Sequence, residues 1–78
     1  MSKEKYNKAF VEGLDIEDKK DMQSLKFNDI EEWDSIGHMS LMSALEDEFD
    51  ISLETDDIVD FSSYEKGISI LKKYNVKI

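Results

Sequence analysis

The segment from Ile36 to Phe49 has apolar residues at the spacing of one face of an α-helix, and this pattern constrains the fold more than any other. Ile36, Met39, Met42, Leu45 and Phe49 recur at steps of three and four residues, close to the helical turn of about 3.6 residues. We expect this stripe to face the core, with Met39 and Met42 as filling side chains. The chain has no proline and only three glycines, so little in it interrupts helices.

The N-terminal segment is also predicted to be helical, over about residues 3 to 13. We expect Gly13 to end this helix, because glycine is favoured just after a helix C-terminus. A polar stretch from Asp15 to Asp34 follows, which we interpret as a long loop held to the core by scattered apolar residues. These anchors are Ile16, Met22, Leu25, Phe27, Ile30 and Trp33.

The C-terminal third is predicted to contain two helices. A short one is expected over residues 55 to 60, with Thr55 as its cap. Another is expected from Ser62 to about Tyr74, because Ser62 and Glu65 have the spacing of a capping box. The predicted fold class is therefore all-α: a small four-helix bundle with a long first loop and a short third helix. Its shared core is expected to include Leu45, Phe49, Ile68 and Leu71.

The chain is short and acidic, and both properties disfavour several classes of protein. Its 78 residues suffice for one small domain, so we expect a single domain over residues 1–78 that is not an enzyme. The absence of cysteine excludes disulfides and thiolate metal sites. The net charge of -9 disfavours nucleic acid and anionic membranes as partners. Without a long apolar run or a signal-peptide pattern, we expect a monomeric cytoplasmic protein.

The acidic residues are concentrated in one stretch. Residues 29–60 contain twelve Asp and Glu and no Lys or Arg, whereas the rest of the chain contains seven acids and all ten lysines. Crowded like charges oppose the compact state. We therefore interpret this block as a recognition surface for a basic partner, with a merely solvated surface as the alternative.

Ser35 stands at the predicted start of the helix that follows Trp33 and Asp34. Either Asp34 or Ser35 can act as the N-cap by accepting from first-turn amides. A serine hydrolase is disfavoured, because the first glycine of the G-x-S-x-G pattern and the strand before it are both missing. Ser35 is therefore either only a helix cap or the site of a different chemistry.

No metal site is predicted. A calcium loop that begins at Asp50 would need glycine where Thr55 stands and glutamate where Phe61 stands. His38 is the only histidine, and we expect it to be an exposed or packed side chain rather than a ligand.

The run Trp33-Asp34-Ser35-Ile36-Gly37-His38-Met39 is followed by Leu41, Leu45 and the acidic segment 46–51. This sequence closely resembles the acyl carrier protein family, and the four-helix pattern extends the resemblance over nearly the whole chain. In that family a separate transferase joins the serine hydroxyl to 4′-phosphopantetheine from coenzyme A. The resemblance implies that Ser35 is the attachment site, with Asp34 and Ile36 as its motif neighbours, and that acyl groups are carried as thioesters on the arm.

The resemblance also implies partners. They are a phosphopantetheinyl transferase and enzymes that load or use the carried group through basic docking patches. The implied docking residues are Glu46, Asp47, Asp56, Asp57 and Met39. A serine at a helix N-terminus agrees with this role, because the positive end of the helix dipole favours an attached phosphate.

Two positions depart from the pattern of carriers for fatty-acid synthesis. Gly37 and Ser40 stand where those carriers usually have acids two and five residues after the serine. The resemblance implies a role in fatty acid or secondary metabolite biosynthesis, but these departures disfavour a housekeeping role in fatty-acid synthesis and favour a specialised carrier. An aminoacyl carrier of the D-alanyl or peptidyl type and an unmodified acidic protein-interaction module remain as alternatives.

Overall fold

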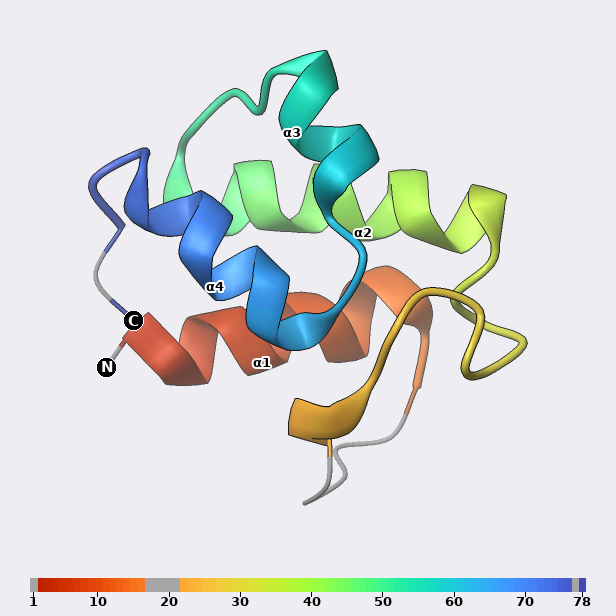
Figure 1. The fold of residues 1–78 in the computed structure, drawn as a ribbon. Helices are drawn as coiled ribbons and strands as arrows, with labels where there is room; N and C mark the ends of the chain where they lie inside the picture. Colours follow the sequence, from red (N-terminus) through yellow and green to blue (C-terminus); the bar gives the residue numbers. More distant parts are fainter. Residues whose placement is uncertain (1, 17–21, 77) are drawn as a thin grey trace.

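The computed structural model describes residues 2–16, 22–76 and 78, and this part of the chain is built from helices (Figure 1). α1 spans Ser2–Leu14, the 3-10 turn η1 spans Met22–Ser24, α2 spans Ser35–Phe49, α3 spans Thr55–Asp60 and α4 spans Tyr64–Lys72. The predicted all-α fold with a long first loop and a short third helix is confirmed. No helix among the described residues is long and apolar enough to cross a membrane.

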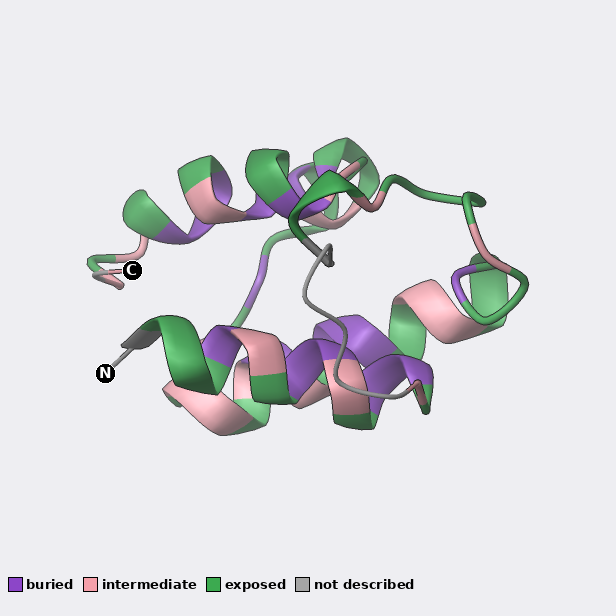
Figure 2. Ribbon diagram, turned by 90° about the horizontal axis from the view of Figure 1, so that it is seen from below, coloured by how far each residue is buried: buried purple, intermediate pink, exposed green. Residues whose placement is uncertain are grey.

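The helices form two layers. α2 runs antiparallel to α1, and α4 lies obliquely across one face of this pair (Figure 1). Figure 2 shows that the buried residues of α4 face those of α1 and α2. α3 crosses α2 on the side of the molecule opposite α1, and the start of α1 lies at the same end as the last described residue, Ile78.

Gly13 lies where the backbones of α1 and α2 are close together. The prediction that the first helix ends at Gly13 is wrong, because α1 continues to Leu14 and the left-handed conformation that follows belongs to Asp15, with φ of 55°. A Cβ atom on Gly13 would lie 2.6 Å from the Cα of Leu41. The glycine therefore serves helix packing, by letting the two backbones approach without a side chain between them.

Five aromatic rings from four parts of the chain fill the core. Phe10 lies among them, with ring centroids 5.0 Å from Tyr6, 5.4 Å from Trp33 and 5.1 Å from Tyr64; its fourth neighbour is Phe61. The Tyr6 hydroxyl donates to the Tyr64 carbonyl oxygen at 2.6 Å, and burial raises the pKa of the Tyr6 phenol well above its usual range. Phe10 thus joins α1 to the long loop and to both C-terminal helices.

The buried face of α2 differs from the predicted stripe. Leu41, Met42 and Leu45 are buried, whereas Ile36 and Met39 are 82% and 54% exposed. The prediction that Met39 fills the core is wrong. The middle and the end of α2 pack on the core, whereas Ile36 and Met39 in its first turns border an open cavity instead.

The shared core of α2 and α4 is partly as predicted. Leu45 and Leu71 are fully buried, while Phe49 and Ile68 are half-buried and pack against the core. In the long loop, Trp33 is fully buried and Phe27 is 37% exposed. The remaining described anchors are half-buried against the core, namely Ile16, Leu25 and Ile30, and the side chain of the predicted anchor Met22 lies outside the described residues.

The start of α4 is tied to the long loop. Ser63 is the N-cap, and its hydroxyl oxygen accepts from the Lys66 N–H at 3.0 Å. The predicted capping box at Ser62 is wrong, because the N-cap is Ser63, one position later. The Ser62 carbonyl oxygen accepts from the Phe27 N–H at 2.9 Å, which brings the loop beside the segment that joins α3 to α4.

Candidate functional site

Ser35 is the first residue of α2, and its hydroxyl is free. The N-cap is Asp34, whose Oδ1 accepts from the Gly37 N–H at 2.8 Å. Ser35 is exposed, and within the described part of the chain its side chain has no hydrogen-bond partner. Asp34 therefore performs the capping role that was open to both residues, and the Ser35 hydroxyl remains available to another molecule.

Trp33 and His38 lie on either side of this cap and fix how the loop enters α2. The indole Nε1–H of Trp33 donates to Nδ1 of His38 at 2.9 Å, and the planes of the two rings differ by 14°. They occupy the positions just before the cap and in the first turn that often form a hydrophobic staple. His38 was expected to be either exposed or packed, and it is half-buried against Trp33. The Trp33 partner was not predicted, although the spacing of the two residues is typical of such a pair.

Gly37 lies where the backbone leaves no room for a side chain. A Cβ atom there would be 1.8 Å from the carbonyl oxygen of Glu32 and 3.0 Å from its carbonyl carbon. Both are backbone atoms, so no side-chain rotation can relieve the overlap. The glycine that departs from the usual fatty-acid carrier pattern is therefore required by the loop that precedes α2.

Gly37→Ala is expected to destabilise the fold. The added methyl group must push the Glu32 carbonyl away, and overpacking of this kind costs about 1–3 kcal/mol. Urea unfolding followed by circular dichroism measures the loss. Ser40→Ala, at an exposed position of the same helix, is the control and should change stability by less than about 0.5 kcal/mol. Equal stability of the two variants would contradict the tight contact at Gly37.

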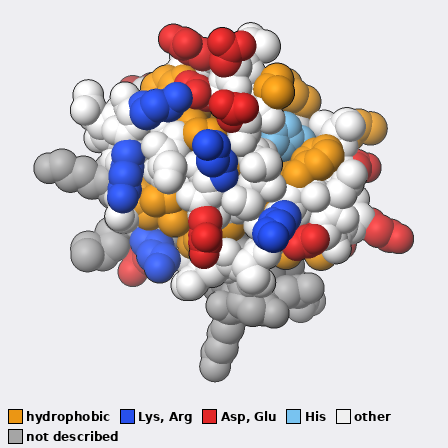
Figure 3. All heavy atoms as spheres, in the orientation of Figure 1, with side chains coloured by type: hydrophobic (Ala, Val, Ile, Leu, Met, Phe, Trp, Pro, Cys, Tyr) orange, Lys and Arg blue, Asp and Glu red, His pale blue; other side chains and the backbone are white. Residues whose placement is uncertain are grey.

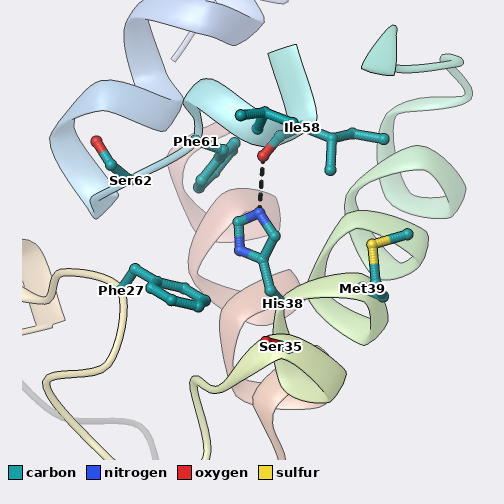
Figure 4. Close-up of a pocket in the computed structure, with 8 residues that line it drawn as sticks. Phe27, Ser35, His38, Met39, Ile58, Phe61 and Ser62 are labelled. Carbon is teal, nitrogen blue, oxygen red and sulfur yellow. Dashed lines mark hydrogen bonds between the residues drawn. The ribbon is translucent and has the colours of Figure 1, made fainter. Parts of the chain in front are cut away.

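An apolar cavity of about 370 Å³ opens beside Ser35. Figure 4 shows the imidazole of His38 projecting from α2 toward α3, where its Nε2 lies 2.8 Å from the Ile58 carbonyl oxygen. The walls come from the first turns of α2, from the end of α3 and from two loops. The lining residues are Phe27, Ser35, His38, Met39, Ile58, Val59, Phe61 and Ser62.

Large apolar side chains are exposed at the rim of this cavity. Met39 and Val59 belong to its lining and are 54% and 75% exposed, and Ile36, next to Ser35, is 82% exposed. Figure 3 shows apolar side chains gathered on both sides of the imidazole. Clusters of exposed apolar side chains commonly mark interaction sites, so this rim is a candidate surface for partner proteins.

Whole-chain similarity to known proteins decides the family. Acyl carrier proteins of Buchnera aphidicola subsp. Acyrthosiphon pisum, strains Tuc7 and APS, are each 32% identical to this chain over 74 residues, which cover 95% of this chain and 92% of theirs. The acyl carrier protein of strain 5A is 31% identical over the same length. This chain belongs to the acyl carrier protein family. No protein-family model matches the sequence, and no solved structure matches it.

The acids that the acyl carrier protein family implies for docking have different environments here. Asp47 and Asp56 are exposed, and Figure 3 shows carboxylates gathered over α3. Glu46 is half-buried, and its Oε2 accepts from the Leu53 N–H at 2.7 Å, so this side chain closes the loop between α2 and α3. Among the described residues, no group of His, Asp or Glu side chains is arranged to hold a metal ion.

Asp57 is buried, with 7% of its surface exposed. Its Oδ1 accepts from Lys73 Nζ at 2.6 Å, and its Oδ2 accepts from the Tyr74 hydroxyl at 2.5 Å. The Tyr74 oxygen in turn accepts from the Glu54 N–H at 3.0 Å.

Glu54, rather than Thr55, is the N-cap of α3, and it makes no side-chain cap bond. The predicted Thr55 cap is wrong, and this cluster holds the start of α3 in its place.

The Asp57 cluster changes two sequence-based interpretations. The hydrogen bonds from Lys73 and Tyr74 lower the pKa of Asp57, and the bond to Asp57 raises the pKa of Lys73, so this pair stays charged at neutral pH. The Asp57 carboxylate is therefore already bonded within the fold and is not free to contact a partner protein. The acidic block also has lysine neighbours in space, because Lys8 lies 3.9 Å from Glu48. The two residues of each ion pair are far apart in the sequence, so no local sequence pattern predicts these pairs.

Proposed function

We propose that this protein carries acyl groups on a 4′-phosphopantetheine arm attached to Oγ of Ser35. The observation that carries the proposal is the free, exposed hydroxyl of Ser35 at the start of α2, with the cap supplied by Asp34. Membership of the acyl carrier protein family supports the carrier role.

The residues around Ser35 suit an attached phosphodiester. The first turn of a helix presents unpaired N–H groups and the positive end of the dipole, which favour negative charge. Asp34 uses Oδ1 for the cap, so its other oxygen can take part in binding the metal ion of a transferase. Ile36 stands next to Ser35 as an exposed apolar contact for that enzyme. Once attached, the arm supplies the thiol on which acyl groups are held as thioesters.

The cavity beside Ser35 favours an apolar acyl cargo over an aminoacyl one. Its walls include the rings of Phe27 and Phe61 and the side chain of Ile58. Burial of apolar surface is favourable, whereas the ammonium group of an aminoacyl thioester would lose its hydration there. No carboxylate lines the cavity among the described residues, so the ammonium group would find no ionic partner.

Incubation of the protein with coenzyme A, Mg²⁺ and a broad-specificity phosphopantetheinyl transferase tests the proposal. The intact mass of the wild-type protein should increase by one phosphopantetheine. The proposed transfer forms a bond between Ser35 Oγ and the phosphorus that bears the pantetheine, and adenosine 3′,5′-bisphosphate leaves. An unchanged mass, with a known carrier modified in the same mixture, would favour the unmodified interaction module.

The partner surface that we propose combines the apolar rim with exposed acids. Ile36, Met39 and Val59 supply apolar area near Ser35, while Asp47 on α2 and Asp56 on α3 supply negative charge. Basic patches on the transferase and on the loading enzymes are its complement. Asp57 is not part of this surface, because its carboxylate is already paired.

Asp47→Lys together with Asp56→Lys is expected to slow association with such an enzyme. Loss of electrostatic steering should lower the rate of arm attachment roughly tenfold at low salt, and the difference should shrink as salt rises. The measurement is the initial rate at limiting carrier concentration, at low and high ionic strength.

The matched control places the same change in net charge on other helices. Glu12→Lys together with Glu65→Lys alters exposed residues of α1 and α4 and should slow attachment much less. If both double variants react at the same rate, net charge rather than this surface governs association.

A further inference from the structure

We propose that His38 is a positioning residue that links the Trp33 side chain to α3 beside Ser35, and that arm attachment depends on the charge of His38, because the bond to Trp33 requires the neutral imidazole. The inference rests on the proposed attachment at Ser35. The hydrogen bonds that carry it are Trp33 Nε1–H to His38 Nδ1 at 2.9 Å and His38 Nε2 to the Ile58 carbonyl oxygen at 2.8 Å.

These two hydrogen bonds determine the tautomer of His38. An indole N–H can only donate, so Nδ1 of His38 must accept and cannot carry a proton. A carbonyl oxygen can only accept, so Nε2 must carry the proton and donate to Ile58. Both bonds exist together only in the neutral imidazole that is protonated at Nε2.

The surroundings of the imidazole are aromatic. Its ring centroid lies 5.4 Å from that of Phe27 and 6.1 Å from that of Phe61, both in edge-on geometry. Trp33 has no exposed surface, so water cannot readily replace His38 as the acceptor of its indole N–H. A buried donor that loses its acceptor is costly, which makes Nδ1 the sensitive atom.

Within the described residues, no carboxylate forms an ion pair with His38. Asp34, at the cap of α2, accepts from Gly37 N–H. The acids of the other elements around the imidazole are bonded elsewhere or exposed. In the loop, Asp29 accepts from the Lys26 N–H, and Glu31 and Glu32 are exposed. On α3, Asp57 pairs with Lys73, and Asp56 and Asp60 are exposed.

Protonation of His38 would place an N–H on Nδ1, facing the N–H of Trp33. The bond between them would be lost, although Nε2 could still donate to Ile58. The first turn of α2 also disfavours a cation, because it is the positive end of the helix dipole. Trp33 is separated from Ser35 only by the cap residue, so its release loosens the backbone that presents the hydroxyl.

Two conservative variants separate the two hydrogen bonds. The side-chain oxygen of Asn lies as many bonds from Cβ as Nδ1 of His, so His38→Asn keeps an acceptor for Trp33. The side-chain nitrogen of Gln corresponds in the same way to Nε2, so His38→Gln keeps only the donor to Ile58. Neither amide changes charge with pH, whereas histidine commonly does so between about pH 5 and 8.

NMR of the full-length, unmodified protein tests the tautomer and the Trp33 bond without reference to the arm. At pH 7.5 the imidazole ¹⁵N shifts should show Nδ1 unprotonated and Nε2 protonated. The Trp33 indole N–H should exchange with solvent roughly tenfold or more faster in His38→Gln than in the wild type, and His38→Asn should restore slow exchange. Protonated Nδ1 at pH 7.5, or equal exchange in wild type and His38→Gln, overturns the proposal.

Arm attachment across pH 5.5 to 8 supplies the functional measurement, with wild type and both variants assayed in the same transferase mixture so that the transferase's own pH dependence cancels. Relative to His38→Asn, the kcat/KM of the wild type should fall severalfold as the pH drops, and His38→Gln should be low throughout. A wild-type to His38→Asn ratio that stays constant with pH overturns the dependence on charge. If the wild-type protein gains no arm at any pH, the proposed function fails, and the NMR result still decides the tautomer.

Discussion

Ser35→Ala is expected to abolish the gain of one phosphopantetheine that the wild-type protein should show. The variant removes only the hydroxyl, because the cap of α2 is made by Asp34 and the Ser35 side chain has no partner among the described residues. Alanine is also well tolerated at a helical position. The fold should therefore persist while attachment is lost completely, and intact-mass spectrometry with circular dichroism measures both.

Ser62→Ala is the matched control for this experiment. Ser62 also lines the cavity and is exposed, but it precedes the cap of α4 rather than starting a helix. It should be modified at no detectable level, and its replacement should leave the mass gain unchanged. A mass gain that persists in Ser35→Ala and disappears in Ser62→Ala would show that the arm is attached to Ser62 instead.

Phe10→Ala is expected to have the largest effect on stability. Phe10 has no exposed surface and its ring packs against those of Tyr6, Trp33, Phe61 and Tyr64. Truncation of a buried Phe costs about 3–5 kcal/mol, against a total stability of about 5–15 kcal/mol for a typical domain. The melting temperature and the urea midpoint should both fall well below those of the wild type, as thermal and urea unfolding followed by circular dichroism will measure.

Phe27→Ala makes the same chemical change at the rim of the cavity, where the ring is 37% exposed. Its cost should be well below that of Phe10→Ala, because less apolar surface leaves the core and the open cavity needs little repacking. If Phe27→Ala is as destabilising as Phe10→Ala, the cavity rim contributes to the core as much as the aromatic cluster does.

The sequence by itself determined the helices and the family. Helical spacing reports interactions between residues three and four apart, so the existence and order of the helices could be predicted from the chain alone. The motif around Ser35 likewise pointed to the acyl carrier protein family, and similarity over most of the chain agrees. Helix ends were less certain, because competing caps such as Ser62 and Ser63 differ by one residue and the loop at Phe27 selects between them.

Only the tertiary structure decided what each candidate side chain does. The apolar pattern of α2 does not distinguish residues that face the core from Met39, which faces open space. Asp57 belonged by sequence with the docking acids, but Lys73 and Tyr74 reach it from the end of α4. Gly37 departed from a family pattern, and only the position of the Glu32 carbonyl shows why. Each outcome depends on atoms brought together by folding rather than by neighbouring positions in the chain, so local periodicity and motif spacing contain no record of it.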